Sequence, residues 1–452
     1  MSIEILERPE ISEEAISFVS EECIQTGFSL CTSCKKVIPA KIVMREGYTY
    51  LVKNCIYENK DTEALIGKGW GKSELRKKLS LNWPFVKPNF GQVGIKEEDI
   101  INLKYVNYIL LSLTKKCNSH CSICFNRDTE EYGELSLSYI KKILAKFKNR
   151  RVILFGGEPT VRKDLDEIIR IINQSGNTPI LFTNGLKLSQ LSYCRELKEA
   201  GLESVCLSFD GFAPHIYRLM RGVSEKEYHF KLAALENLKK IDMDVILQMT
   251  VVKGINEDQI KQIIDFIARN PFICAYWIRP LYLRGGENLM GFDKTNLLSL
   301  DEIKILVCQA LGISPSIFEL WDEVKAEFVS WIVKNLPFAK LSVIEPDTLY
   351  LMREGNTLKP LFNEEDLNEI KTILKNNSWQ RLLNYRYISW VFDIIRTGFD
   401  FSRLEKKFRK KGLVRINLRT LAPYPNFILS NQLTITQIDY FSENFIVAYY
   451  GQ

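Results

Sequence analysis

The stretch Thr114-Lys115-Lys116-Cys117-Asn118-Ser119-His120-Cys121-Ser122-Ile123-Cys124-Phe125 directly follows a short apolar run, Tyr108 to Leu113. Its cysteines are separated by three residues and then by two, so one compact loop can turn all three thiolates toward the same point. A four-iron, four-sulfur cluster usually takes four cysteines, and a set of three leaves one iron open to a small molecule. The alternatives are a zinc knuckle that takes His120 as its fourth ligand, or a chance spacing.

The middle of the chain contains short runs that are almost continuously apolar, as buried parallel strands tend to be. Six strands are predicted, at Tyr108 to Leu113, Arg151 to Phe155, Pro179 to Thr183, Ser204 to Phe209, Val245 to Val252 and Cys274 to Ile278. Apolar residues at helical spacing predict helices that begin near Leu137, Leu165 and Ile260. Ser136 is the expected N-cap of the first helix, and Gly176 is expected to stop the second.

Strands that alternate with helices form a parallel sheet with the helices outside. We therefore expect an α/β fold, a partial (β/α)6 barrel, and a ligand site at the carboxyl ends of its strands. The cysteine loop follows the first strand. The sequence Phe155-Gly156-Gly157-Glu158-Pro159-Thr160 ends the second strand. Alone, a Gly-Gly-Glu-Pro stretch is more often a turn than a site, but one strand-helix unit after the cysteine loop it indicates a shared site.

These two motifs resemble the CxxxCxxC and GGEP signatures of the radical S-adenosylmethionine (SAM) superfamily, and the resemblance covers roughly residues 105 to 285. It implies that Cys117, Cys121 and Cys124 hold one [4Fe-4S] cluster and carry the catalysis, with SAM bound at the fourth iron. Reduction of the cluster then cleaves SAM to methionine and a 5'-deoxyadenosyl radical, which abstracts hydrogen from the substrate. A reductant such as flavodoxin or ferredoxin is the expected partner, together with an organic substrate.

The same resemblance implies which residues contact SAM. Gly156 and Gly157 would let the backbone approach its methionine moiety closely, and Glu158 would accept a hydrogen bond from its ammonium group. Three more contacts are expected at Thr183 near the methionine portion, Ser208 near the ribose and Gln248 in the same cavity. Arg279, after the sixth strand, is interpreted either as a contact in this cavity or as a surface ion pair.

A second group of cysteines lies near the start of the chain. Cys31, Cys34 and Cys55 are typical of a small metal knuckle, and a β-hairpin is expected between Ile38 and Val52. The segment resembles the N-terminal cysteine module of the radical SAM branch that includes archaeal tetraether lipid synthase and the pterin methylases.

In that branch a Pro-Glu-His-Gly stretch commonly follows the last cysteine, whereas this chain has Cys55-Ile56-Tyr57-Glu58-Asn59. A tetrahedral zinc or single-iron site takes four ligands, so Cys23 and Glu58 are both candidates for the fourth. The other interpretation is a set of reduced cysteines packed among apolar residues.

Three regions are expected: residues 1–100 with the knuckle, residues 101–290 with the barrel, and residues 291–452 as a mixed α/β extension that covers the substrate. Amphipathic helices are predicted at Asp301 to Leu311 and Ile317 to Lys334, followed by a β-leaning end from Leu413 to Tyr450. Several aromatic residues of the extension are interpreted either as a cover over the barrel mouth or as ordinary core: Trp321, Phe328, Trp331, Tyr385, Trp390 and Phe392.

Composition narrows the class of protein. The net charge of +6 is modest for 452 residues, and the basic clusters at residues 76–78 and 406–411 are short, so solvated faces explain them better than a nucleic-acid groove. No run of about 18 uncharged apolar residues is present, and the acidic start lacks the pattern of a signal peptide. We expect a cytoplasmic protein that is not transmembrane, does not bind nucleic acid and keeps its cysteines reduced.

The leading hypothesis is an enzyme of the transferase class. It would abstract hydrogen from an unactivated carbon and then form a carbon-carbon bond, by methylation or coupling, on an apolar or small-molecule substrate. Modification of a ribosomally made peptide is the alternative among enzymes. A non-catalytic iron-sulfur or zinc-binding protein of an assembly is the alternative from another class. Only Cys308 follows Cys274, so auxiliary clusters are not expected in the tail.

Overall fold

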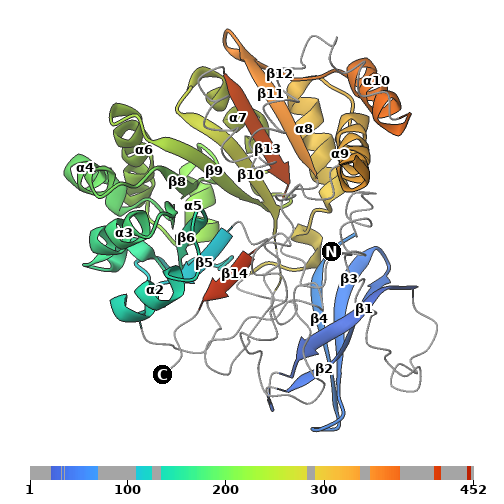
Figure 1. Ribbon diagram of the computed structural model, residues 1–452, viewed down its shortest axis with the longest axis horizontal. Helices are drawn as coiled ribbons and strands as arrows, with labels where there is room; N and C mark the ends of the chain where they lie inside the picture. Colours follow the sequence, from blue (N-terminus) through green and yellow to red (C-terminus); the bar gives the residue numbers. More distant parts are fainter. Residues whose placement is uncertain are drawn as a thin grey trace.

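The computed structural model describes residues 22–31, 33–34, 36–69, 108–124, 134–281, 283, 291–335, 347–376, 412–418 and 445–448. Within these ranges the strands form one ten-stranded sheet and one four-stranded sheet (Figure 1). The order in the larger sheet is β12-β11-β13-β10-β9-β8-β7-β6-β5-β14.

The centre of the larger sheet consists of six neighbouring parallel strands. They are β5 (Tyr108–Ser112), β6 (Arg151–Phe155), β7 (Thr178–Thr183), β8 (Ser204–Ser208), β9 (Asp244–Val251) and β10 (Ile273–Pro280). Each coincides with a predicted strand to within two residues. The prediction succeeds because both faces of these strands are covered, which makes each of them an almost continuously apolar run.

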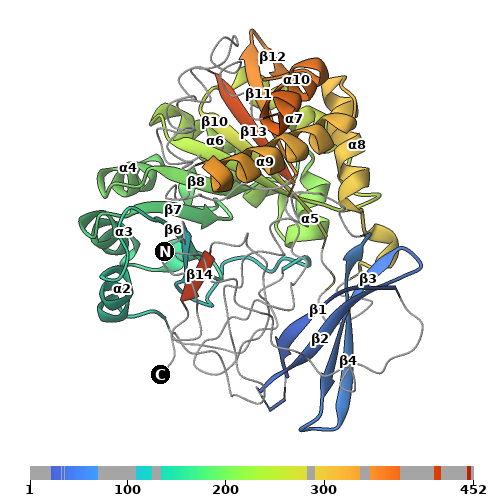
Figure 2. The same cartoon turned by 45° about the vertical axis from the view of Figure 1, so that its right-hand side comes forward.

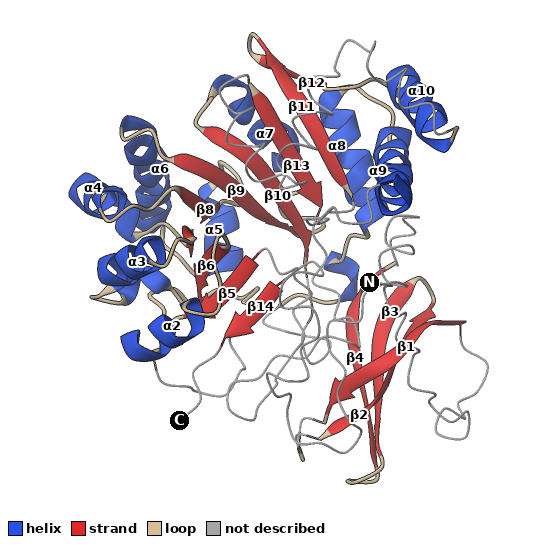
Figure 3. Ribbon diagram, viewed as in Figure 1, coloured by secondary structure: helices blue, strands red, loops and turns tan. Residues whose placement is uncertain are grey.

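Helices connect these strands and lie outside the sheet, as Figure 3 shows for α2, α3, α4 and α6. Their bounds are α2 (Leu137–Leu144), α3 (Leu165–Gln174), α4 (Leu191–Glu199), α5 (Pro214–Arg221), α6 (Glu225–Lys240) and α7 (Gln259–Arg269). The predicted helices correspond to α2, α3 and α7. The Ser136 hydroxyl accepts a hydrogen bond from the Tyr139 amide, which confirms the cap of α2, and Gly176 follows α3 with a φ of 77°.

Successive residues of a strand point to opposite faces, and the two faces of this sheet pack differently. Leu247 and Met249 of β9 are fully buried against the outer helices in the main apolar core. Ile246 of the same strand packs on the inner face with Cys206 and Trp277. Each fully buried aliphatic side chain of this kind stabilises the fold by about 1.5–3 kcal/mol relative to an exposed one. The inner face is therefore a distinct surface, to which β8, β9 and β10 contribute.

The C-terminal region extends this sheet at both edges. Its elements are α8 (Leu300–Leu311), α9 (Ser316–Asn335), β11 (Thr348–Glu354), β12 (Thr357–Pro360), α10 (Glu364–Lys375), β13 (Leu413–Leu418) and β14 (Phe445–Ala448). Strand β13 pairs parallel with β10, and β14 pairs parallel with β5. The fold is thus mixed α/β with a parallel core and no closed barrel. The predicted helices correspond to α8 and α9, and residues 419–444 of the β-leaning end lie outside the described residues.

The aromatic residues of α9 belong to the core rather than to a cover over the barrel mouth. Trp321 is buried, and its ring centroid lies 5.1 Å from that of Tyr350 and 5.5 Å from that of Phe362. Phe328 and Trp331 stack on each other and pack, partly buried, against the same core. The other three aromatic residues singled out in the sequence, Tyr385, Trp390 and Phe392, lie outside the described residues.

The four-stranded sheet is an antiparallel meander that lies beside the larger sheet (Figure 2). It consists of β1 (Glu22–Leu30), β2 (Val37–Arg45), β3 (Tyr48–Cys55) and β4 (Lys60–Lys68), and its β2–β3 pair is the predicted hairpin. Lys68 forms a 2.6 Å ion pair with Glu302 of α8, and Leu65 packs in one apolar cluster with Met220 of α5. These contacts attach the small sheet to the larger one.

Among the described residues, no single helix is long and apolar enough to cross a membrane, although one pair of segments bent by 110° passes by length and composition (Lys294–Leu311 with Ser316–Phe328).

Candidate functional site

The loop with Cys117, Cys121 and Cys124 leaves the carboxyl end of β5. Cys117 is exposed, and the other two cysteines are half-buried. The pKa of the Cys117 thiol is raised to about 11, because partial desolvation and the negative charges of Glu158, Cys121 and Cys124 disfavour its thiolate. The thiols therefore lie close enough to repel one another as thiolates, and bound cations would relieve that repulsion.

The C-terminal end of α5 supports this loop from one side. The backbone carbonyl of Met220 accepts hydrogen bonds from the amides of Ser122 (2.9 Å) and Ile123 (3.4 Å). Gly222 caps the helix with a φ of 60°, and a Cβ added there would lie 2.7 Å from the carbonyl oxygen of His120. Only glycine lets the loop and the helix end approach this closely.

The Gly-Gly-Glu segment supports the loop from the other side. The Gly157 amide donates to the Thr114 carbonyl at 2.6 Å, and the Glu158 amide donates to the Lys116 carbonyl at 2.8 Å. A Cβ on Gly156 would lie 2.3 Å from the Thr114 oxygen, and one on Gly157 would lie 2.3 Å from the Lys116 oxygen. Both glycines are therefore needed for the approach of two segments of this chain, whatever their approach to SAM. The sequence alone does not indicate this use.

Glu158 is buried, and its carboxylate accepts four hydrogen bonds from protein groups. Oε1 accepts from the Thr160 amide (3.1 Å), the Thr160 hydroxyl (2.7 Å) and the Thr183 hydroxyl (2.7 Å), and Oε2 accepts from the Asn184 amide (2.7 Å). Burial raises the pKa of this carboxyl, and the hydrogen bonds from Asn184, Thr183 and Thr160 oppose the shift. In this structure Glu158 joins the end of β6 to the end of β7.

Asn184 extends this connection back to the cysteine loop. Its Nδ2 donates to Asn118 Oδ1 at 2.7 Å, and its amide binds Glu158. The Thr183 hydroxyl, expected near SAM, accepts from the Gly185 amide at 3.0 Å besides donating to Glu158. The ends of β5, β6 and β7 are thus linked directly to one another. We did not single out Asn184 from the sequence, although it follows Thr183 at the end of a predicted strand.

A buried ion pair behind the cysteine loop was also missed. Arg221, at the end of α5, donates from Nε to Asp210 Oδ2 at 2.7 Å and from a terminal nitrogen to Asp210 Oδ1 at 3.0 Å. Asp210 is fully buried and also accepts a hydrogen bond from the Thr250 amide. Burial would lower the pKa of Arg221, but the charge and hydrogen bonds of Asp210, together with Cys121, raise it overall. The Arg221 guanidinium also interacts electrostatically with the Cys121 thiol. A fixed positive charge therefore lies beside one of the three cysteines.

We also did not single out Lys231 of α6 from the sequence. Its ammonium group donates to the carbonyls of Asn184 (2.6 Å) and Ser208 (3.0 Å), so it ties the ends of β7 and β8 together. The side chain is only 1% exposed. Burial, followed by the charge of Arg221, lowers the pKa of Lys231 to about 8. A lysine within a helical segment normally indicates a solvated face, which explains why the sequence did not reveal it.

The remaining sequence-predicted contacts lie toward the inner face. Gln248 is half-buried and accepts a hydrogen bond from Cys206 at 3.7 Å. Ser208 is its neighbour in register on β8 and is also half-buried. Arg279 is 3% exposed and lies two residues after Trp277 of the inner face, so the interpretation as a surface ion pair is wrong.

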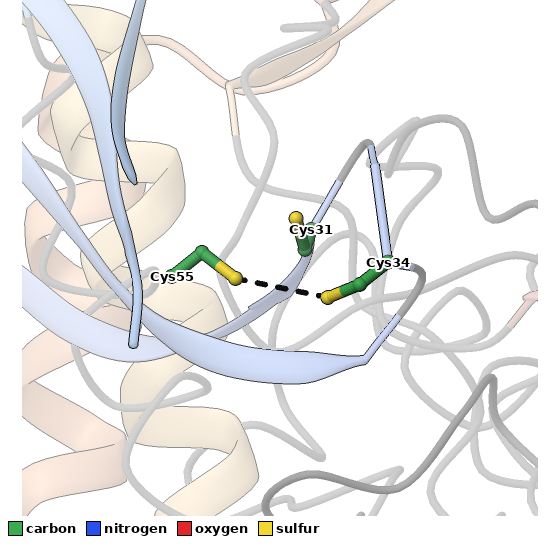
Figure 4. Close-up of side chains that lie close together, drawn as sticks. All are labelled: Cys31, Cys34 and Cys55. Carbon is green, nitrogen blue, oxygen red and sulfur yellow. Dashed lines mark hydrogen bonds between the residues drawn. The ribbon is translucent and has the colours of Figure 1, made fainter. Parts of the chain in front are cut away.

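The N-terminal cysteines form a tighter group. The sulfur atoms of Cys31, Cys34 and Cys55 all lie within 4.8 Å of one another, and those of Cys34 and Cys55 are 3.7 Å apart (Figure 4). A tetrahedral ion with zinc-sulfur bonds of about 2.3 Å separates its sulfur ligands by about 3.8 Å, whereas a disulfide would bring them to about 2.05 Å. This donor set fits a metal ion.

The sulfur atoms of Cys117, Cys121 and Cys124 are less tightly grouped. Among the described residues, the three N-terminal cysteines alone have ligand atoms that all lie within 4.8 Å of one another, whereas the loop cysteines and His120 do not form such a group. A single zinc ion at this loop, the alternative left open by the sequence, requires that convergence. A four-iron cluster is larger than one ion and suits three thiols spaced around it, so the donor set fits the cluster.

The family comparisons agree with this geometry. The model of the radical SAM superfamily matches residues 111–267, and the model of the HMPTM N-terminal zinc ribbon domain matches residues 23–56. The chain is also 32% identical over 237 residues to a probable GTP 3',8-cyclase of Thermoplasma volcanium, of which it covers 70%, or 48% of this chain. The chain therefore belongs to the radical SAM superfamily. Members of this superfamily are enzymes that use a [4Fe-4S] cluster, SAM, a reductant and a substrate. The N-terminal zinc ribbon, with Cys31, Cys34 and Cys55, could bind a further metal.

Among individual relatives, the chain is 31% identical over 264 residues to 7,8-dihydro-6-hydroxymethylpterin dimethyltransferase of Methanocaldococcus jannaschii, over 54% of this chain and 50% of that protein. The chain thus spans about half the length of that protein and of a probable GTP 3',8-cyclase of Pyrococcus abyssi. The solved structure of Streptococcus suis SuiB bound to SAM aligns with a TM-score of 0.39 and 16% identity, over 51% of this chain and 49% of that one.

Proposed function

We propose that this radical SAM enzyme abstracts hydrogen from an unactivated carbon of a small molecule and goes on to form a carbon-carbon bond, by methylation or coupling. The observation that carries the proposal is the double support of the cysteine loop. The backbones of Gly157 and Glu158 bind one side of the loop, and Met220 binds the other. Three thiols are thereby held beside the carboxyl ends of the strands, where a cofactor can reach the inner face of the sheet.

The residues of the chain have separate tasks in this proposal. When bound, the cluster supplies the electron that cleaves SAM. Cys117, Cys121 and Cys124 hold it, and the ion pair of Arg221 with Asp210 fixes the end of α5 that supports the loop. Glu158 fixes the ends of two neighbouring strands. Trp277, whose ring lies 5.5 Å from that of Phe182, helps to keep water from the inner face.

We further propose that the substrate is polar rather than apolar. Strand β13 places Arg415 opposite Ala275 and Asn417 opposite Trp277, and both partners belong to the inner face. Paired residues of neighbouring strands share a face, so Arg415 and Asn417 lie on it as well, each at most 3% exposed. Arg279 and Gln248 add two more polar side chains. Residues 291–452 would then contribute to substrate binding through β13.

The first experiment is anaerobic reconstitution followed by reduction with SAM and chromatography for 5'-deoxyadenosine. We expect 5'-deoxyadenosine from the wild type and none from Cys121→Ala, because that variant loses a cluster ligand. Flavodoxin or ferredoxin is expected to replace the chemical reductant. Reduced, intact cluster without cleavage in the presence of candidate substrates would contradict the proposed chemistry.

The substrate can be sought through isotope transfer. The names of two relatives make 7,8-dihydro-6-hydroxymethylpterin and GTP the first compounds to try, each deuterated at carbon. Deuterium in 5'-deoxyadenosine would identify the attacked carbon, and a methylated or cyclised product would decide the bond that forms. Deuterium transfer only from a ribosomally made peptide would overturn the small-molecule proposal in favour of peptide modification.

A further inference from the structure

The two turns that hold the N-terminal cysteines lie at the same end of the four-stranded sheet. The first joins β1 to β2 and contains Cys31 and Cys34, and the second joins β3 to β4 and begins at Cys55. Consecutive strands of this sheet are antiparallel, so alternate hairpin turns meet at one end. Two turns therefore face one metal position, and the second contributes one cysteine.

Each turn has a backbone hydrogen bond at its leading cysteine. In the first, the Ser33 amide donates to the Cys31 sulfur at 3.4 Å. In the second, the Glu58 amide donates to the Cys55 carbonyl at 3.3 Å, which holds the backbone of Glu58 next to the cysteine. The third residue after the leading cysteine is Cys34 in the first turn, and its side chain is a metal ligand. The corresponding residue of the second turn is Glu58.

The backbone after Glu58 suits this role. Asn59 has a φ of 48°, the left-handed conformation that asparagine tolerates better than most residues, and it reverses the chain into β4. In this structure the Glu58 carboxylate lies outside the group of sulfur atoms that are within 4.8 Å of one another, but its side chain is exposed and can rotate toward them without displacing core residues. The ammonium group of Lys36, just after the first turn, lies 4.1 Å from the ring of Tyr57 and joins the two turns.

The register of the sheet excludes the other candidate, Cys23. Its Cα pairs with Val43, whereas Leu30, next to Cys31, pairs with Val37. The eight positions between Cys23 and Cys31 span roughly 25 Å of extended strand. Cys23 is therefore at the far end of the hairpin, out of reach of the three sulfur atoms.

We propose that the carboxylate of Glu58 is the fourth ligand of a zinc ion held by Cys31, Cys34 and Cys55. Zinc accepts carboxylate oxygen at about 2.0–2.2 Å together with cysteine sulfur. Zinc binds both thiolate sulfur and carboxylate oxygen in tetrahedral sites, so a set of three sulfurs and one oxygen suits it. Metal loading of this site can be measured without turnover, so its test does not depend on the radical chemistry.

The test uses full-length protein loaded with zinc or cobalt, read by metal analysis and X-ray absorption. All measurements use a protein with Cys117→Ala and Cys121→Ala, which lacks the cluster. With the ribbon unchanged, this protein should bind one ion through three sulfurs and one oxygen. Glu58→Gln should lower zinc affinity about tenfold or more, by comparison with losses at ligand-supporting residues. Glu58→Cys should restore tight binding and change the ligand set to four sulfurs.

Glu46→Gln is the matched control, because Glu46 is an exposed glutamate in the β2–β3 turn at the opposite end of the same sheet. It should leave the affinity unchanged. Equal affinity of Glu58→Gln and wild type, or an unaltered ligand set in Glu58→Cys, would overturn the proposal in favour of water as the fourth ligand. Four sulfurs in the wild type would overturn it too, and a loss of that fourth sulfur in Cys23→Ser would identify its source.

Discussion

The Thr183 hydroxyl donates a 2.7 Å hydrogen bond to the Glu158 carboxylate, across 25 positions of sequence. Both residues were expected to contact SAM, and in this structure they contact each other. Glu158 accepts further hydrogen bonds from Thr160 and Asn184, so it acts as a buried joint between β6 and β7. The site is therefore organised by bonds within the protein before any cofactor arrives.

Glu158→Gln should test this joint. The amide nitrogen of glutamine cannot accept a hydrogen bond and would face a donor, so at least one buried donor loses its partner. We expect the free energy of unfolding without SAM to fall by about 1–3 kcal/mol. Urea unfolding measures it, with Thr183→Val as a milder comparison that removes one of the donors. Unchanged stability together with a higher KM for SAM would show that Glu158 serves only the cofactor.

Gly157→Ala should disturb the cysteine loop directly, because the new methyl group would lie 2.3 Å from the Lys116 oxygen and 2.4 Å from the Lys115 oxygen. Overpacking of this kind costs about 1–3 kcal/mol. We expect a lower iron content after reconstitution, measured by iron and sulfide analysis. Gly67→Ala is the control, since nothing lies within 4 Å of a Cβ at that position. Full iron loading of Gly157→Ala would contradict the proposed support of the loop.

Arg221→Met should leave Asp210 as a buried carboxylate without its cation. Breaking a buried pair in this way costs about 3–5 kcal/mol, and the Thr250 amide offsets part of it. Thermal or urea unfolding reports the loss. The double variant with Asp210→Asn should recover a substantial part, because no uncompensated charge remains. If the double variant instead loses as much unfolding free energy as the two single variants added together, Arg221 and Asp210 are not coupled.

Lys231 should give stability a characteristic pH dependence. Its pKa is lowered to about 8 in the folded protein, mainly by burial, then by Arg221, against the opposite effect of Asp210. Between about pH 8 and the usual pKa near 10.5, the unfolded chain binds a proton that the folded chain does not, so this group makes stability rise with pH in that window.

Unfolding of wild type and Lys231→Met at a series of pH values isolates this contribution, because tyrosines and cysteines that titrate in the same range are common to both. The difference in the free energy of unfolding, wild type minus variant, should rise from about pH 8 to about pH 10.5. Two parallel profiles would mean that Lys231 keeps its ordinary pKa.

The six central strands could be predicted because each is an almost continuously apolar run, such as residues 152–155 of β6. The cysteine loop and Glu158 could be placed at the same edge for a related reason: carboxyl ends of parallel strands meet there. What could not be predicted is how the motif residues bind each other. Gly156 and Gly157 are needed because they lie against backbone atoms of residues 114–116. The spacing of residues in the sequence does not reveal a contact between these two segments.

Helix α6 shows a second limit. It buries Lys231 and Asn237 together with Leu235 and Leu238, so polar residues interrupt its apolar face. Asn237 donates to the carbonyls of Leu188 and Ser189, and Lys231 donates to strand ends. A buried polar side chain is stable only with such partners, which belong to segments remote in the sequence. Periodicity alone cannot reveal them.

Strand β13 lies between β10 and β11 although it is made long after both. During synthesis on the ribosome, β10 and β11 each present an unpaired edge until residues 413–418 emerge. Exposed edges of this kind recruit strands from other chains. Late closure by a distant segment is also slow, because contacts between residues far apart in the sequence form slowly. A nascent or truncated chain that lacks β13 should therefore be prone to aggregation and should depend on chaperones, even though its six central strands are complete.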